Sequence, residues 1–127
     1  MQSIEVRVYY EDTDLAGIVY YANYFKYIER GRTEFLRALG VDQSALKDEQ
    51  GIVFAVRRVE GDYLKPAKMD DLLTVETSVG ELQKARFTML QEVKRGGELL
   101  FKASVTLVCL SSSGRPTRVP DFIRKLT

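Results

Sequence analysis

The sequence has no histidine, no tryptophan and a single cysteine, Cys109, among its 127 residues. Without histidine, the Ser-His-Asp and Cys-His mechanisms are excluded, together with the common zinc sites. A lone cysteine cannot form an intrachain disulfide, which is typical of a protein from a reducing compartment. Any general base in this chain must therefore be a carboxylate, a lysine or a tyrosine.

A strong charge of either sign and a long apolar run are also missing. The 19 basic and 18 acidic residues give a net charge of +1, so no nucleic-acid partner is expected. No apolar run approaches the roughly 20 residues that span a bilayer, so no membrane insertion is expected. The N-terminal segment MQSIEVRVYYED alternates and is acidic too early for a signal peptide, and we expect a cytoplasmic protein.

What is present is the composition of an ordinary globular domain. Hydrophobic residues make up 45% of the chain and charged residues 29%. The sequence has no internal repeat, no linker and no low-complexity tract. A single domain over residues 1–127 is therefore predicted.

One stretch, residues 9–40, contains the only long helical pattern and the polar turn that precedes it. The helix is predicted to begin near Asn23, a residue type that caps helix N-termini, and to end near Gly40. Gly31 lies in the middle of the apolar face of this helix. We interpret it as admitting a sheet or a partner chain at close range, with a tolerated surface glycine as the alternative.

Strand patterns occupy most of the remaining chain. Residues 41–51 read as a polar connection with one short helical turn, and residues 121–126 as a short C-terminal helical turn. The predicted strands are 3–10, 52–63 with a bend near Gly61, 72–82, 84–95 and 98–111, with a hairpin turn at Gly96-Gly97. Short turns imply antiparallel neighbours, and one helix with a wide apolar face must cover the sheet. The pattern predicts an α+β fold with an antiparallel sheet curling around one helix. The exposed edges of the sheet and the core surface left at the ends of the helix favour self-association, through strand edges or across the helix termini.

The polar turn before the helix holds three carboxylates, Glu11, Asp12 and Asp14. A carboxylate beside the free N–H groups of a helix N-terminus places a base next to a patch that stabilises negative charge. Each also has a structural interpretation, with Glu11 solvated, Asp12 bonded to the turn backbone and Asp14 favoured by the helix dipole. Glu29 is interpreted as paired within the helix.

The run DTDLAGIVYYANYFKYIERGRTEFLRALG resembles the signature of the hotdog-fold acyl-CoA thioesterases. It is most similar to the 4-hydroxybenzoyl-CoA thioesterase group and, within it, to the Tol-Pal-associated, YbgC-type enzymes. The matching positions cover nearly the whole chain and are Tyr10, Asp12, Asp14, Gly17, Val19, Tyr20, Asn23, Tyr24, Glu29, Arg32, Glu34, Leu36, 53–63, Pro66, Ala67, Asp71, Leu73, Gly114, Arg115, Pro116 and Pro120. The resemblance implies the hotdog fold, a five-stranded antiparallel sheet wrapped around one long central helix. It also implies a homodimer with active sites at the interface, which in some members pairs into a tetramer.

The resemblance further implies hydrolysis of an acyl- or aroyl-CoA thioester to the free acid and CoA. Asp14 matches the catalytic carboxylate, as general base or nucleophile, and the Tyr21 backbone N–H matches the group that polarises the thioester carbonyl. The implied substrate-binding residues are Gly17, Val19, Tyr20 and Tyr24, with Arg57, Arg58, Lys84 and Arg86 as candidates for the CoA phosphates. For the tyrosines the alternative is core and dimer packing, and for the basic residues a solvated face. Coenzyme A enters as part of the substrate, and neither a cofactor nor a metal is implied.

One position departs from the pattern. Many YbgC-type members have a histidine where this chain has Tyr21, but the backbone N–H survives that change. The benzoyl-type members also lack this histidine, so Tyr21 is interpreted as favouring aryl or bulkier acyl groups. Hotdog dehydratases depend on a catalytic histidine that this chain lacks. A non-catalytic module that binds acyl-CoA or acyl carrier protein is the alternative function, although a pure binder gains nothing from a carboxylate at Asp14.

Overall fold

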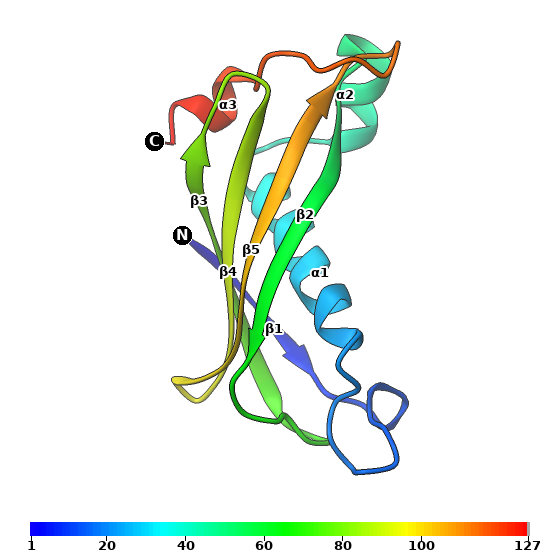
Figure 1. Cartoon of the computed structure of the whole chain (residues 1–127), viewed down its shortest axis with the longest axis vertical. Helices are drawn as coiled ribbons and strands as arrows, with labels where there is room; N and C mark the ends of the chain where they lie inside the picture. The colour runs from blue at the N-terminus through cyan, green and yellow to red at the C-terminus, as the bar shows by residue number, and fades with distance from the viewer. Residues whose placement is uncertain (127) are drawn as a thin grey trace.

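A computed structural model of the chain describes residues 1–126 and contains one five-stranded antiparallel sheet packed against a long helix (Figure 1). The strands are β1 (Gln2–Arg7), β2 (Val53–Tyr63), β3 (Leu72–Leu82), β4 (Arg86–Arg95) and β5 (Glu98–Leu110). The helices are α1 (Asn23–Ala38), α2 (Gln43–Gln50) and α3 (Asp121–Arg124), and a short 3₁₀ turn, η1, covers Tyr10–Asp12. The strand order is β1-β3-β4-β5-β2, so β1 and β2 form the two edges. The predicted architecture is confirmed.

Helix α1 buries one face against the sheet, and Gly31 is the point of closest approach. A Cβ atom on Gly31 would lie 2.9 Å from both Val75 Cγ1 and Thr77 Oγ1 of β3. Next to it, buried Gln91 donates its Nε2 to the Ile28 carbonyl at 2.7 Å and to Thr77 Oγ1 at 2.9 Å. The predicted close approach of a sheet is confirmed. The buried residues of α1 are Tyr24, Tyr27, Ile28, Gly31, Phe35 and Leu36.

The edge strand β2 is exposed along most of its length. Its first three residues are half-buried and residues 56–63 are all exposed. Two apolar side chains on this stretch, Val56 and Val59, are 49% and 37% exposed. One edge of β2 pairs with β5, and no strand of residues 1–126 pairs with the other. Unpaired strand edges of this length are natural sites for pairing with another chain.

Two details of the prediction are wrong. Helix α1 begins at Asn23 as predicted, but Asn23 does not cap it, because Ala22 occupies the N-cap position and the Asn23 side chain donates to the Asp12 carbonyl at 2.8 Å. The irregularity in β2 lies between Val56 and Arg58 rather than at Gly61. Gly61 keeps the regular register because its missing Cβ makes room for the Phe101 ring, which a Cβ would meet at 2.9 Å.

The connection after α1 is more helical than the sequence indicated. Where one short turn was expected, α2 runs for eight residues. The Asp42 side chain caps it by accepting from the backbone N–H groups of Ser44 and Ala45. Gly51 ends the helix at a φ of 66°, in the left-handed region that glycine tolerates. A cap at each end stabilises a helix whose apolar periodicity is weak.

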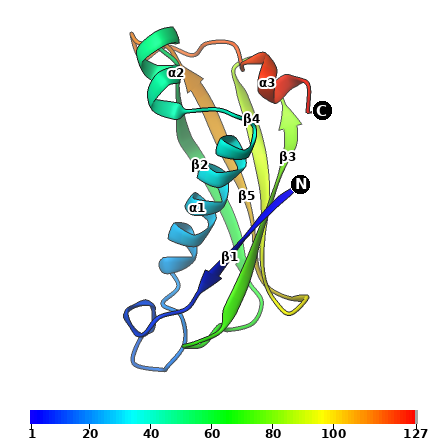
Figure 2. The same ribbon diagram turned by 180° about the vertical axis from the view of Figure 1, so that it is seen from behind.

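The loop that enters α1 and the connection between β2 and β3 meet at one end of the molecule, while α2 and α3 lie at the other (Figures 1 and 2). The contact is made by backbone bonds, from Val19 N–H to the Ala67 carbonyl and from Val8 N–H to the Asp71 carbonyl, both 2.9 Å. No helix in the described part of the chain is long and apolar enough to cross a membrane. The fold thus gathers the polar turn, the start of α1 and the end of β2 in one region.

Candidate active site

The polar turn is a tight hairpin that presents Asp14. An antiparallel bridge between Thr13 and Val19 closes the loop, and Gly17 N–H donates to the Asp14 carbonyl at 3.0 Å. Gly17 has a φ of 80°, which explains a glycine at this turn. Asp14 Oδ1 accepts the Ala16 N–H at 2.9 Å. Within residues 1–126 no group donates to Asp14 Oδ2, so one carboxylate oxygen is held and the other is available.

The first turn of α1 presents backbone donors. The chain is fixed before the helix because Tyr20 N–H donates to the Asp12 carbonyl at 2.9 Å, and Asn23 N–H then donates to the Tyr20 carbonyl at 2.8 Å. The two N–H groups between them, those of Tyr21 and Ala22, bond to no atom of the described residues. Free amides at a helix N-terminus attract negative charge. The loop therefore sets a carboxylate beside a site suited to an oxyanion.

Asp14 and the start of α1 share one hollow of about 380 Å³. Its lining is aromatic and aliphatic apart from one carboxylate and one lysine. The lining residues are Asp14, Ile18, Val19, Tyr20, Tyr21, Tyr24, Tyr63, Lys65 and Pro66. Five predicted site residues, Asp14, Val19, Tyr20, Tyr21 and Tyr24, are thus brought together, while Gly17 shapes the turn without lining the hollow. Ile18, Tyr63, Lys65 and Pro66 were not predicted as site residues. Tyr63 and Pro66 belong to the family pattern, but nothing local in the sequence places the end of β2 beside α1.

The pKa values of three tyrosines in this hollow, Tyr20, Tyr24 and Tyr63, are shifted upward. Burial, followed by the nearby Tyr21 and Tyr24, raises the pKa of Tyr63, and burial raises that of Tyr24. The neighbouring Tyr21 hydroxyl raises the pKa of Tyr20, with a smaller contribution from the Asp14 carboxylate. These phenols are therefore protonated at neutral pH and serve as hydrogen-bond donors rather than bases. Among the groups lining the hollow, the carboxylate is left as the base.

The segment carrying Lys65 and Pro66 is held by an ion-pair network. Arg95 donates through Nη1 to Asp71 Oδ2 at 2.8 Å and to the Pro66 carbonyl at 3.2 Å. Its Nη2 donates to Glu98 Oε1 at 2.7 Å, and Lys65 Nζ donates to Glu98 Oε2 at 2.7 Å. The bonds from Lys65 and Arg95 lower the pKa of Glu98, which keeps it ionised. Lys65 is thus paired, and this rim of the hollow is fixed.

The predicted phosphate contacts lie elsewhere in the same chain. Arg57, Arg58 and Arg86 line a separate hollow of about 240 Å³. Arg58 and Tyr63 are five residues apart on β2, which corresponds to roughly 17 Å along the strand. Lys84 lies in the β3–β4 turn, where its carbonyl accepts from Val119 N–H at 2.8 Å. Within one chain, the structure does not bring these four residues to Asp14.

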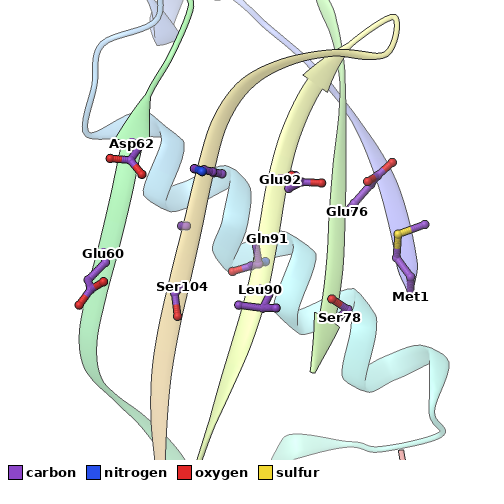
Figure 3. Close-up of a pocket in the computed structure, with 11 residues that line it drawn as sticks. Met1, Glu60, Asp62, Glu76, Ser78, Leu90, Gln91, Glu92 and Ser104 are labelled. Carbon is purple, nitrogen blue, oxygen red and sulfur yellow. The ribbon is translucent and has the colours of Figure 1, made fainter. Parts of the chain in front are cut away.

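A further hollow, of about 450 Å³, opens on the outer face of the sheet, away from α1 (Figure 3). Its carboxylates are Glu60, Asp62, Glu76 and Glu92, and they outnumber its one lysine, Lys102. Such a lining repels an anionic ligand. Residues 1–126 also contain no group of three or more metal-ligating side chains placed to hold an ion. The hollow beside Asp14 is therefore the candidate active site.

Comparison with known proteins agrees with this architecture. The family model of the thioesterase superfamily matches residues 16–102. An acyl-CoA thioesterase YbgC from Haemophilus influenzae is 46% identical over 123 residues, which cover 96% of this chain and 90% of that protein. A probable thioesterase from Bartonella henselae, solved by crystallography, is 38% identical with a TM-score of 0.88, and the match covers 94% of this chain and 98% of that one.

A solved complex extends the likeness to a ligand-bound enzyme. A variant of 4-hydroxybenzoyl-CoA thioesterase bound to 4-hydroxybenzoyl-CoA superposes with a TM-score of 0.92 at 25% identity, covering 99% of this chain and 98% of that chain. The predicted hotdog fold is confirmed by these neighbours and by the strand order β1-β3-β4-β5-β2. The chain belongs to the thioesterase superfamily and is a thioester hydrolase.

Proposed function

We propose that the enzyme hydrolyses acyl- or aroyl-CoA thioesters in the hollow beside α1, with Asp14 as the catalytic carboxylate. The observation that carries this proposal is that Asp14 and Tyr21 line the same hollow, and that the Tyr21 N–H bonds to no atom of residues 1–126. Coenzyme A enters as the leaving group of the substrate, and the reaction needs no other cofactor. We also propose a cytoplasmic location, which the single cysteine supports because one cysteine cannot form an intrachain disulfide.

The start of α1 stabilises the charge that develops during attack on the thioester. When a nucleophile adds to the thioester carbon, the carbonyl oxygen becomes negative. The Tyr21 N–H, helped by the helix dipole, donates to that oxygen at no cost of reorganisation. Removing one donor of this kind typically costs about 10²–10³ in kcat. This donor is a backbone group, so the absence of histidine does not weaken it.

Asp14 has two chemical routes to the same products. As a general base, Asp14 removes a proton from water, the oxygen bonds to the thioester carbon, and the carbon–sulfur bond breaks to release CoA thiolate, which takes up a proton. As a nucleophile, an Asp14 oxygen bonds to that carbon and expels CoA, and water then hydrolyses the mixed anhydride. The free Oδ2 supports either role. Ala16 N–H holds Oδ1, which fixes the direction of the carboxylate.

The tyrosines of the hollow form the proposed acyl pocket. Tyr20 and Tyr21 lie with ring centroids 4.9 Å apart, and Tyr24 and Tyr63 meet edge-on at 5.5 Å. Aromatic rings of this kind pack well against a flat ring, since offset and edge-on contacts are favourable. We therefore propose aryl or bulky acyl groups as the preferred substrates. Val19 supplies the buried base of the pocket.

We propose that the enzyme is a homodimer joined through β2. Antiparallel pairing of the exposed residues 56–63 with the same stretch of a second copy would cover the unpaired edge and extend the sheet. We expect a mass of twice the 14.5 kDa chain, or of a further doubled tetramer, in sedimentation equilibrium. Replacing Val59 with Asp, which introduces facing like charges, should shift the mass toward the monomer. A wild-type protein that sediments as a monomer at micromolar concentration contradicts the proposal.

Pairing of this kind also accounts for the position of the basic residues. When residues 56–63 pair antiparallel about their centre, Arg57 and Arg58 of the partner subunit come alongside residues 61–63 of this chain. The arginine hollow of one copy then borders the Asp14 hollow of the other. We propose that Arg57, Arg58 and Arg86 bind the CoA phosphates in this way. Lys84, in the β3–β4 turn, is the outermost candidate for the same role.

The phosphate role predicts an effect on KM that depends on the substrate. In the double variant Arg57→Gln/Arg58→Gln we expect KM for an acyl-CoA to rise about 10-fold, because charged hydrogen bonds to the CoA phosphates are lost at an exposed site. The corresponding N-acetylcysteamine thioester has no nucleotide, so its KM should not change. Arg118→Gln, an exposed arginine outside both hollows, is the matched control. Equal KM changes for the two substrates would contradict the phosphate role.

A panel of short-chain, long-chain and aryl acyl-CoAs tests the function directly by free-thiol release. Turnover with a preference for aryl or bulky groups is expected. Tight binding without thiol release would instead favour the alternative, a module that holds acyl-CoA or acyl carrier protein. Asp14 with a free Oδ2 argues for turnover, because a binding module has no use for a carboxylate aimed at a carbonyl.

A further inference from the structure

Tyr63, the last residue of β2, contacts the first turn of α1. Its hydroxyl donates to the Tyr21 carbonyl oxygen at 3.0 Å. Its ring packs against Phe101 at 4.8 Å between centroids, and meets Tyr24 and Tyr21 edge-on at 5.5 Å and 6.2 Å. Phe101 is fully buried, so the core fixes one side of the Tyr63 ring. The hydroxyl is therefore a placed donor rather than a mobile surface group.

The Tyr21 carbonyl lies between the two unpartnered amides. The Tyr21 N–H precedes it in the same residue, and the Ala22 N–H belongs to the same peptide unit. Its backbone hydrogen bond, from Tyr24 N–H, is long at 3.4 Å. The bond from Tyr63 is therefore the shorter of the two that hold this carbonyl. A hydrogen bond to a peptide oxygen also strengthens the N–H of the same peptide as a donor, and here that N–H belongs to Ala22.

We propose that Tyr63 is a positioning residue for thioester hydrolysis, whose hydroxyl orients and polarises the peptide unit between Tyr21 and Ala22. This inference rests on the proposed function, in which the Tyr21 N–H binds the thioester carbonyl oxygen. It extends that function by making the Ala22 N–H, which belongs to the polarised peptide unit, a second donor to the same oxygen. The Tyr63 proton stays on its own oxygen throughout and acts only through the peptide. Because Tyr63 belongs to the exposed edge strand, the strand that would pair in a dimer also fixes the carbonyl-binding amides.

Tyr63→Phe tests the role kinetically, because it removes the hydroxyl and keeps the ring. We expect kcat to fall about 3- to 10-fold, the effect of losing one hydrogen bond. KM should change less than about twofold, since the amides bind most strongly in the transition state. The melting temperature should be retained because the contact with Phe101 remains. Tyr10→Phe, which removes an exposed hydroxyl outside the hollow, should leave both constants unchanged.

The carbonyl stretch of a bound thioester gives a readout that a structural role would not move. Infrared spectra of a bound carbon-13-labelled acyl-CoA are compared in two variants. The first is Asp14→Asn, which should bind the substrate and hydrolyse it only slowly, and the second is the double variant Asp14→Asn/Tyr63→Phe. We expect a band lowered from its free value in the first variant and closer to the free value in the second. A band lowered equally in both, with kcat unchanged in Tyr63→Phe, overturns the role of Tyr63 alone. A band at its free value in both overturns the proposed carbonyl site and the Tyr63 role with it.

Discussion

Replacing Asp14 with Asn should lower kcat for acyl-CoA hydrolysis by about 10²–10⁴-fold, the range over which a positioned base or acid acts. Asn has nearly the same size, and its carbonyl oxygen can still accept the Ala16 N–H that holds Oδ1. It cannot remove a proton from water or form an anhydride, so both proposed routes are lost. Free-thiol release, followed beside a circular dichroism spectrum and a melting curve, measures the effect on a folded protein.

Glu11→Gln is the matched control for this variant. Glu11 is an exposed carboxylate in the same polar segment, three residues before Asp14, and does not line the hollow. We expect its kcat to equal that of the wild type. If Asp14→Asn retains most of its activity, the assignment is wrong. Asp12 is then the weaker candidate, since its Oδ2 already accepts the Tyr9 N–H at 2.8 Å.

Gly31→Val should lower the free energy of unfolding by about 3 kcal/mol or more, enough to remove much of the stability of a small domain. The first added carbon would stand 2.9 Å from Val75 and Thr77 and 3.0 Å from Gln91. The helix must then move from the sheet, which breaks the bond between Gln91 and the Ile28 carbonyl. The gain in helix propensity over glycine is below about 1 kcal/mol and does not compensate. Urea unfolding of the wild type and variant measures the difference.

Ala38→Val separates crowding from helix propensity. Ala38 is an exposed residue of the same helix, so a β-branched side chain there tests propensity with little crowding. We expect a loss below about 1 kcal/mol. Gly31→Ala should fall between the two variants. Equal losses for Gly31→Val and Ala38→Val would show that the contact of α1 with β3 is looser than the structure indicates.

Local patterns in the sequence were sufficient for the strands and the long helix, and the family resemblance supplied part of the candidate site. The predicted strand 72–82 coincides with β3, because alternation and flanking turns are written in consecutive residues. Asp14, Tyr20, Tyr21 and Tyr24 were assigned through the family resemblance, whose signature runs continuously through one loop and the helix that it enters. Gly31 stood out from the local pattern, as a glycine where helix propensity disfavours one.

The rest of the site depends on contacts between distant segments. Tyr63 is separated by 42 residues from the Tyr21 carbonyl that it contacts, and nothing around it in the sequence reports that contact. The prediction that Asn23 caps the helix was wrong for the same reason, since its side chain donates to the Asp12 carbonyl across the folded loop. The arginines were assigned to phosphates by residue type alone. Their distance from Asp14 became apparent only with the register of β2, and only a second copy of the chain would bring them close.

The most direct test of the central claim, that Asp14 acts on the thioester rather than merely binding it, is a single-turnover experiment. The dissociation constant of an acyl-CoA and the rate of thiol release at saturating enzyme are measured for wild type and Asp14→Asn. For Asp14→Asn we expect a dissociation constant within a few-fold of the wild type and a release rate at least about 100-fold lower. A release rate equal to that of the wild type, or a loss explained entirely by weaker binding, would contradict this claim.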